Sequence, residues 1–281
     1  MSRYHGYGDA ILVNTIAWHY GEKHQTKVLV GTNHPIIFQN NPWVKIFPSK
    51  NEKTLYRYAR ILRILGYDVT HFTMQYLDLK ESNLSLLNLL AYKCGLTPQQ
   101  PLQPLIFFQN KIIKQQWNNK SKPWIAIQSS GRKDWTDNRN WMPEYYLKLS
   151  QFLKPNFNIV HVGYPLDPAI DCHLDLRGKT NVMDVFSIVS SVNLFIGQVG
   201  FLMHAAESVG CSSVIIYGGF EWPEFHQYQK QIPIKSQIEC APCFNLNCPF
   251  EKKCMKEITV EQVLNSVQAF FASKQHHSSI V

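Results

Sequence analysis

Short apolar runs alternate with amphipathic stretches along most of the chain. Apolar runs bounded by Gly, Ser or Asn are typical of buried strands, and apolar residues spaced three and four apart are typical of helices. The pattern predicts strands at 27–32, 124–130, 158–163, 193–197 and 212–219. It predicts helices at 52–66, 82–95, 143–153, 180–192, 201–210 and 259–273, and a further helix that begins near Asp9. Strands in regular alternation with helices predict an α/β fold.

Local signals place several helix ends. Ser82 and Thr259 are the expected N-terminal caps of their helices, and Pro143 occupies a first turn. Gly66 and Gly95 follow the last apolar positions of two helices, where glycine commonly ends a helix. A new strand is expected to begin directly after Gly66.

A change of composition divides the chain. Residues 97–123 are rich in Pro, Gln, Asn and Lys, which indicates a connection between domains. We therefore expect an N-terminal domain at 1–110, a linker at 111–122 and a C-terminal domain at 123–281. Two successive α/β halves predict two Rossmann-like domains that face a cleft.

Length and composition indicate a globular protein without a membrane span, but they leave its partners open. A chain of 281 residues can bury a real core, and it contains no unbroken apolar stretch long enough to span a membrane. The N-terminus lacks a signal-peptide pattern, so we expect a cytoplasmic protein, with peripheral contact at the inner face of an anionic membrane as a further option. The net charge of +8 favours anionic partners, although an ordinary basic surface explains it equally well.

Small and polar residues follow two predicted strands of the second half. In open α/β sheets, ligands bind beyond the carboxyl ends of the strands, and a helix N-terminus there suits a phosphate group. Glycines at such turns often serve backbone geometry alone, so each turn by itself is weak evidence for a phosphate site. Together they predict a phosphate site, whose candidate residues are Ser129, Ser130, Gly131, Arg132, Lys133, Arg139, Lys179, Gly197, Gly200 and His204.

Four stretches of the chain form a longer pattern. They are GYGDAI, SSGRKDWTDNRNWMPEYY, LRGKTNVMDVFSIVSSVNLFIG, and GFLMHAAESVG followed by VIIYGG. Their order and spacing resemble glycosyltransferase family nine, the ADP-heptose:lipopolysaccharide heptosyltransferases and their relatives. The resemblance spans nearly the whole chain.

The resemblance implies a GT-B-like fold, with the acceptor bound mainly by the N-terminal half and the nucleotide-sugar by the C-terminal half. It implies transfer with inversion, no catalytic metal or other catalytic cofactor, and Asp9 as the general base. Ser129, Ser130 and Arg139 fall where the family places contacts to the diphosphate. A pure helix cap is the alternative role for Asp9.

The sequence departs from the family pattern near Asp9 and at position 199. Only MSRYH precedes the Gly-Asp turn, where the family has an apolar strand, so we expect the first strand to be truncated. Val199 stands where many relatives have an acidic residue, which puts a donor contact in doubt.

Four cysteines, Cys240, Cys243, Cys248 and Cys254, lie within fifteen residues. In a reducing compartment, closely spaced cysteines more often bind metal than form disulfides, and four thiolates suit tetrahedral zinc or iron. Some relatives in the family carry a similar cysteine-rich metal motif. We favour a structural ion, with an unmetallated or disulfide-bonded loop and a redox cluster as alternatives. The three other cysteines are expected in the core, at Cys94, Cys172 and Cys211.

Three functions are compatible with these observations. The first is a glycosyltransferase that moves a sugar, most simply heptose from ADP-heptose, to a glycan or lipopolysaccharide-type acceptor. The second is a non-catalytic GT-B relative that binds a nucleotide-sugar or a partner. The third is a basic protein that binds nucleic acid through a metal clip, but no recognisable nucleic-acid motif supports it beyond charge and cysteines.

Overall fold

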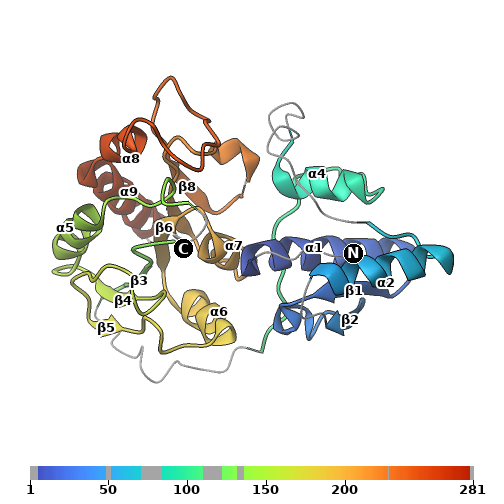
Figure 1. The fold of residues 1–281 in the computed structure, drawn as a ribbon. Helices are drawn as coiled ribbons and strands as arrows, with labels where there is room; N and C mark the ends of the chain where they lie inside the picture. The colour runs from blue at the N-terminus through green and yellow to red at the C-terminus, as the bar shows by residue number, and fades with distance from the viewer. Residues whose placement is uncertain are drawn as a thin grey trace. The chain divides into compact units, whose positions relative to one another are not determined.

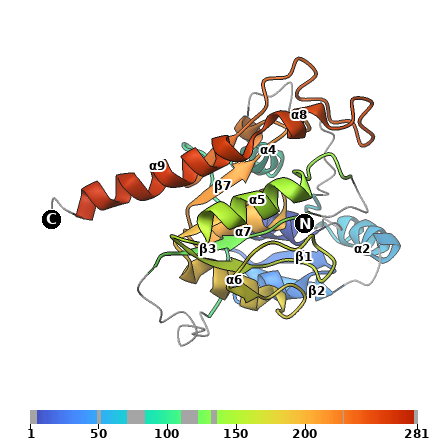
Figure 2. The same ribbon diagram turned by 90° about the vertical axis from the view of Figure 1, so that its left-hand side faces the viewer.

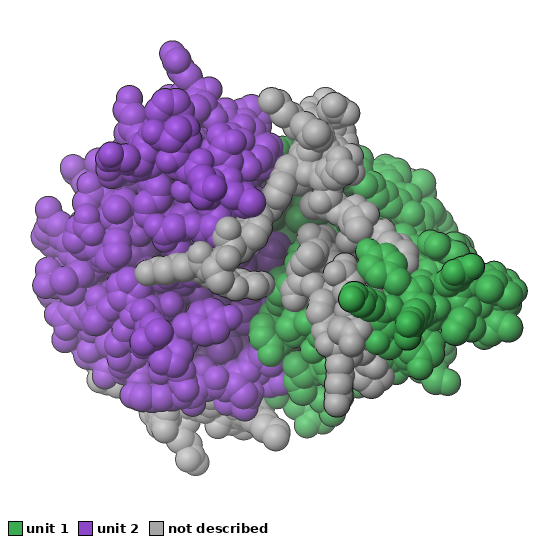
Figure 3. Space-filling model, viewed as in Figure 1, with its two compact units in different colours: residues 1–109, 224–228 green, residues 110–223, 229–281 purple. Residues whose placement is uncertain are grey.

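The computed structural model describes residues 6–48, 52–70, 84–109, 122–131, 136–226 and 228–278 (Figure 1). The chain forms two compact units, coloured separately in Figure 3. Unit 1 comprises residues 1–109 and 224–228, and unit 2 comprises residues 110–223 and 229–281. Residues 111–121 of the predicted linker lie outside the described residues, so the predicted domain boundaries stay a prediction.

Unit 1 is built around one buried helix and a two-stranded parallel sheet. Its elements are α1 (Tyr7–His24), β1 (Val28–Thr32), η1 (Pro35–Phe38), β2 (Val44–Pro48), α2 (Glu52–Ile64) and α4 (Leu86–Lys93). Asn14 is fully buried in α1, where its amide donates to the carbonyl of Leu105 at 3.0 Å and its Oδ1 accepts from Asn41 at 2.9 Å. Because a buried amide without partners is costly, these bonds fix α1 against two distant segments of unit 1.

Unit 2 is a six-stranded sheet whose strands are all parallel. In the sheet the strands lie in the order β5-β4-β3-β6-β7-β8. The elements in chain order are β3 (Trp124–Ile127), α5 (Pro143–Leu153), β4 (Asn158–His161), β5 (Leu174–Asp175), α6 (Val182–Ser191), β6 (Leu194–Gln198), α7 (Phe201–Ser208), β7 (Ser213–Ile216), β8 (Gln231–Ile234), α8 (Lys253–Glu257) and α9 (Val260–Ser278). Between β7 and β8 lies η2 (Pro223–Phe225), most of which belongs to the 224–228 segment of unit 1.

Helices cover both faces of this sheet, as a buried parallel sheet requires. Helices α5 and α9 pack together on one face, and α6 and α7 pack together on the other (Figures 1 and 2). Trp141 is fully buried beside α5 and donates its indole N–H to the carbonyl of Ile258 at 2.8 Å. This bond joins the segment before α5 to the segment before α9.

The α/β prediction is confirmed, and the structure corrects it at several element ends. The cap of α4 is Ser85, whose Oγ accepts from the N–H of Asn88 at 3.4 Å, whereas Ser82 lies outside the described residues. Residues 67–70 form no strand after Gly66. Thr259 does cap α9, with Gln262 as its reciprocal partner at 2.8 and 3.2 Å.

The sequence pattern did not predict three of the strands, β2, β5 and β8. β5 has two residues, too few to show alternation. β8 contains Pro233, which a strand tolerates at a sheet edge because its missing N–H faces no neighbour. β2 carries Lys45 within a short run that ends at Pro48. Within the described residues, no helix is long and apolar enough to cross a membrane.

Candidate functional site

The carboxyl ends of β3 and β6 mark the point where the sheet of unit 2 reverses its order. From β3 the chain proceeds to β4 and β5 on one side, then returns to place β6, β7 and β8 on the other. Connections leave the two central strands in opposite directions at such a switch point, so a crevice forms beyond their ends. Among the described residues, the predicted phosphate-site residues Ser129, Ser130, Gly131 and Gly200 belong to the two turns at this edge.

Polar contacts anchor both the turn after β3 and the end of β6 to the segment around the start of α5. The N–H of Gly131 donates to Asn140 Oδ1 at 2.6 Å. A Cβ atom at Gly131 would stand 3.1 Å from Gln198 Nε2 and 3.2 Å from Asn140 Oδ1, so the backbone fits closely there. The fully buried Tyr146 donates its hydroxyl to Gln198 Oε1 at 2.7 Å, and burial raises the pKa of that phenol. These bonds hold both turns in fixed positions.

The turn after β6 leads directly into α7. Gly200 is the N-terminal cap residue of α7 and supplies no side-chain hydrogen bond to the helix. The first N–H groups of a helix need acceptors from outside it, and they suit an anion. Gly197 has a different role: a Cβ there would lie 2.6 Å from the ring of Phe195, so packing within β6 requires glycine. His204, one turn into α7, is buried.

Arg139 shares a small hollow with the β6–α7 turn. Its Nη2 lies 2.8 Å from both carboxylate oxygens of Glu221, and its guanidinium lies 4.9 Å from the centre of the Phe220 ring. The hollow is lined by Arg139, Val199, Ile216, Phe220, Glu221 and Met255. Glu221 is 4% exposed, so this ion pair is largely removed from water. Glu221 thus brings a carboxylate into the hollow that Val199 also lines.

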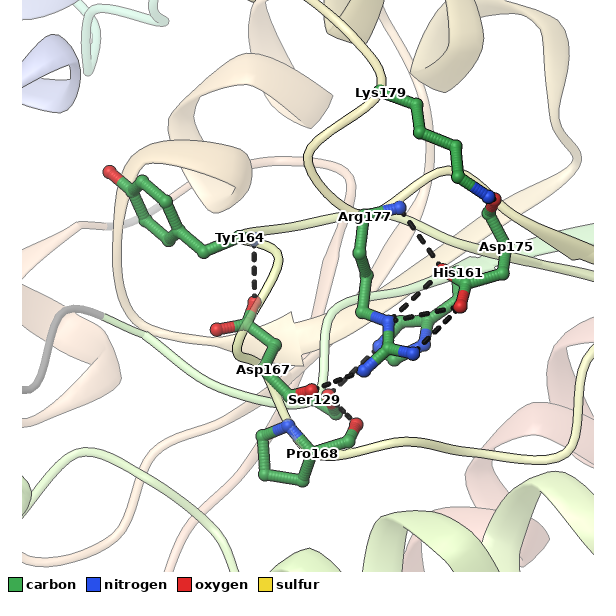
Figure 4. A network of polar contacts seen from close by, with 8 residues as sticks. All are labelled: Ser129, His161, Tyr164, Asp167, Pro168, Asp175, Arg177 and Lys179. Atoms are coloured by element: carbon green, nitrogen blue, oxygen red, sulfur yellow. Dashed lines mark hydrogen bonds and ion pairs between the residues drawn. The ribbon is translucent and has the colours of Figure 1, made fainter.

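Ser129 forms the centre of a buried network at the end of β3 (Figure 4). Its hydroxyl donates to the carbonyl of Pro168 at 2.7 Å and lies 2.9 Å from Nε2 of the fully buried His161. Because the hydroxyl proton goes to Pro168, His161 Nε2 carries a proton and donates to Ser129. Ser130 is also buried and donates to the carbonyl of Gly131 at 3.1 Å. Both hydroxyls are thus engaged within the protein.

The same network continues to the edge strand β5. Arg177 donates to both carboxylate oxygens of Asp175, at 3.0 Å from Nε and 2.7 Å from Nη2, and to the carbonyl of Asp167 (Figure 4). The hydrogen bond from Arg177 lowers the pKa of Asp175 to about 2. Lys179 donates to the carbonyl of Asp175 at 2.8 Å. The structure therefore assigns Lys179 to the loop after β5, at the edge of the sheet.

The switch-point residues that the sequence pattern missed are Asn140, Tyr146, Gln198 and Glu221. Gln198 directly follows the apolar part of β6, and this polar position at a strand end was the available signal. The other three come from loops and a helix whose proximity depends on folding. Of the predicted residues, Arg132 and Lys133 lie outside the described residues.

Asp9 occupies the first turn of α1 in unit 1. Its carboxylate accepts from the N–H of Gly6 at 3.3 Å, so it caps the helix in this structure. The ring of Tyr7 lies 4.3 Å from that of His34, which follows β1. The helix start is thus held beside the carboxyl end of β1, and α1 is preceded by no strand among the described residues.

The four-cysteine segment connects β8 to α8 and is bonded to the loops around the Arg139 hollow. Cys243 and Phe244 donate their N–H groups to the carbonyls of Gly219 at 2.9 Å and Phe220 at 3.1 Å. Further bonds join the 136–138 loop to this segment, from Thr136 to the carbonyl of Leu246 and from Asn138 to the carbonyl of Asn245. The segment therefore braces both loops that carry Arg139 and Glu221.

The cysteine side chains themselves are neighbours. Burial raises the pKa values of Cys243 and Cys254, and the nearby sulfur of Cys248 raises both further. Within the described part of the chain, no three His, Cys, Asp or Glu side chains converge closely enough to hold a metal ion. Cys94 and Cys211 are buried as expected, while Cys172 is only partly buried.

The buried His161 predicts a pH dependence of stability. Burial, and secondarily Arg177, lower its pKa to about 4, so the native state binds fewer protons than the unfolded chain between about pH 4 and 6.5. Stability should therefore fall as the pH drops through this window, by at most about 1.4 kcal/mol per pH unit from this group. Urea unfolding of wild type and His161→Gln at several pH values isolates the effect, because other histidines cancel. Parallel stability curves for the two proteins would contradict the assignment.

Solved structures with similar folds are heptosyltransferases and related enzymes. The E. coli ADP-heptose LPS heptosyltransferase II matches with a TM-score of 0.70 and 14% identity, over 98% of this chain and 99% of that one. A family 9 glycosyltransferase from Veillonella parvula matches with a TM-score of 0.71 and 13% identity, over 97% and 96%. The iron-containing dodecameric glycosyltransferase TibC from enterotoxigenic E. coli matches with a TM-score of 0.74 and 14% identity, over 97% and 75%. No curated protein sequence matches the chain.

These likenesses show a GT-B-like fold, in agreement with the two α/β units. The sequence profile described as glycosyltransferase family 9 (heptosyltransferase) matches residues 81–254, more than half of the chain. The matched range contains β3 to β8, the Arg139–Glu221 hollow and all four clustered cysteines. The chain therefore belongs to glycosyltransferase family 9.

Proposed function

We propose that the chain transfers a heptose-type sugar from ADP-heptose to a glycan or lipopolysaccharide-type acceptor, with inversion at the anomeric carbon. The observation that carries the proposal is the pair of ordered turns at the β3–β6 switch point, which ends at the uncapped start of α7. Membership of family 9 supports sugar transfer. Similar structures described as complexes with ADP-D-beta-D-heptose and with an ADP-2-deoxy-2-fluoro heptose support the choice of donor.

The reaction is a single displacement. The acceptor hydroxyl oxygen attacks the anomeric carbon, the bond from that carbon to the diphosphate oxygen breaks, and ADP leaves. A carboxylate must take the hydroxyl proton, and we assign that role to Asp9 in unit 1. Asp9 accepts a long bond from Gly6 N–H at 3.3 Å, and an ionised carboxylate can accept several hydrogen bonds at once.

The donor diphosphate belongs to unit 2 in this proposal. Backbone N–H groups at the start of α7 offer fixed donors, and Arg139 offers a cation beside the same turn. Glu221 positions Arg139 and supplies the carboxylate that position 199 lacks. His204 is buried, so it would serve through the placement of α7. None of these groups requires a catalytic metal, and turnover should persist in the presence of EDTA.

The alternative function is a family member that binds the nucleotide-sugar without transferring it. Val199 favours this alternative, because the acidic residue common at that position is missing. Product formation separates the two functions: a non-catalytic binder retains donor affinity but releases no ADP in the presence of any acceptor.

We also propose a structural zinc or iron ion at Cys240, Cys243, Cys248 and Cys254. Metal-binding thiolates commonly accept hydrogen bonds from backbone N–H groups around the site. Here the N–H of Lys252 donates to Cys248 Sγ at 3.4 Å. The N–H groups of Asn245 and Met255 donate to the sulfurs of Cys243 and Cys254. The similar TibC structure is described as iron-containing, which supports iron. Four protein ligands leave no open position, so the ion would order the brace described above and take no part in transfer.

The first test concerns Asp9. Asp9→Asn retains an oxygen that can cap α1 but loses basicity, so turnover should fall by orders of magnitude while the melting temperature changes little. ADP release from ADP-heptose, with a lipopolysaccharide acceptor, measures the first and thermal unfolding the second. Near wild-type turnover in Asp9→Asn would assign the base to another residue.

The second test separates Arg139 from its partner. Removal of Arg139 alone would leave Glu221 buried without a counter-charge, which destabilises the fold for reasons unrelated to donor binding. Glu221→Gln is therefore compared with the double variant Arg139→Gln/Glu221→Gln. If Arg139 contacts the diphosphate, calorimetry should show ADP binding weaker by about 1.5–3 kcal/mol in the double variant than in Glu221→Gln. Equal ADP affinities would exclude the contact.

The third test concerns the metal. Protein purified anaerobically should contain about one equivalent of zinc or iron, as expected for a four-thiolate site. Cys243→Ser should lose the ion, melt at lower temperature and bind ADP less tightly, because the segment braces Arg139 and Glu221. Cys211→Ser, which removes a buried cysteine elsewhere in unit 2, is the control for metal content. Four freely reactive thiols without any bound transition metal would reject the site.

A further inference from the structure

The C-terminal end of α2 in unit 1 exposes an apolar tip. Ile61 is 50% exposed, Ile64 77%, Leu65 66% and Tyr67 60%. Helix α2 lies at the periphery of unit 1 (Figures 1 and 2). Soluble surfaces carry single exposed apolar residues commonly, but four within one helix end form a patch that requires an explanation.

The exposed face of α2 is distinct from the face that packs. Ala59 is buried and Leu62 is half-buried, and these two residues attach the helix to unit 1. Arg57, Ile61 and Ile64 share another face, because they are four and three residues apart. This face stays in water although its C-terminal half is aliphatic.

Basic residues flank the tip on the exposed side. Lys53, Arg57, Arg60 and Arg63 are all exposed, and the acidic residue beside the tip is Asp68, which follows Tyr67 and is also exposed. Long basic side chains can extend their charged groups toward phosphate while their stems cover apolar surface. Tyrosine at the edge of the patch has the same dual character.

The turn after α2 holds the tip in place. Gly66 adopts a positive φ of 82°, and the N–H of Tyr67 donates to the carbonyl of Leu62 at 2.9 Å. Arg63 donates to the carbonyl of Val69 at 3.3 Å, which fixes the chain as it leaves the helix. The tip is therefore an ordered projection, with aliphatic residues at its end and cations behind them.

We propose that this tip, Ile61, Ile64, Leu65 and Tyr67, inserts into the interface of a membrane that contains anionic lipid. An amphipathic basic helix with a partly buried apolar face binds such an interface through apolar burial and attraction to anionic headgroups. A protein partner would also cover the aliphatic residues, but the excess of cations, four against the single Asp68 between positions 53 and 70, favours a phosphate-rich surface. The proposal concerns unit 1 alone and does not rest on the transfer reaction.

The test is co-sedimentation of the full chain with vesicles, without donor or acceptor. Phosphatidylcholine vesicles that contain phosphatidylglycerol should bind the protein, and pure phosphatidylcholine vesicles should bind it weakly. Ile64→Ser/Leu65→Ser should reduce binding at least about tenfold through lost apolar burial. Arg57→Gln/Arg60→Gln should reduce it about twenty-five-fold, since each cation near the surface contributes about fivefold.

A matched control is Leu166→Ser, which removes an even more exposed leucine, at 93%, from unit 2 and should leave vesicle binding unchanged. In a second measurement, Tyr67→Trp should show a blue shift of its emission with anionic vesicles. Wild-type binding by Ile64→Ser/Leu65→Ser, or no binding by the wild-type chain, would overturn the proposal. Self-association in the ultracentrifuge that the same variant abolishes, without vesicle binding, would assign the tip to a contact between copies instead.

Discussion

Burial of a parallel sheet on both faces is the constraint on which unit 2 depends. Each connection between parallel strands must cross a face of the sheet. All strands of the unit therefore run in the same direction, and their carboxyl ends lie at the same edge. Because the first strand, β3, lies in the middle, the connections diverge there and leave the switch point between β3 and β6. The sites discussed above, from Gly131 to the start of α7, follow from that one topological fact.

Buried polar groups then fix the detailed shape of this edge. The Ser129–His161 contact, the Tyr146–Gln198 bond and the Arg139–Glu221 pair each satisfy groups that would be costly to leave alone in a dry interior. Such groups tolerate few alternative arrangements, so they restrict the positions of the described residues in both turns. Rigid donors suit a diphosphate, because no reorganisation is needed when charge develops on the leaving group. The cysteine segment extends this rigidity to the loops of Arg139 and Glu221.

Unit 1 contains two helices of different character, the buried α1 and the exposed α2. Its helix α1 is buried along most of its length and presents Asp9 at one end, held by Gly6 and by the Tyr7–His34 contact. Its helix α2 is mostly exposed and combines cations with aliphatic residues at a fixed turn. An enzyme whose acceptor is a membrane glycolipid would gain from both features, because the second would concentrate the enzyme where the acceptor lies.

The sequence by itself determined the α/β class, most helices and central strands, the family and the residue types of both candidate sites. Those features depend on local periodicity, on caps such as Thr259 and on motif spacing, which the order of residues in the sequence is enough to define. Only the tertiary structure decided that Glu221 pairs with Arg139, that Ser129 and Ser130 direct their hydroxyls inward, that Gly197 serves packing, and that Asn140, Tyr146 and Gln198 order the switch point. The physical reason is that these roles depend on contacts between segments distant in the sequence, and burial, which sets the strength of each contact, exists only once the chain has folded.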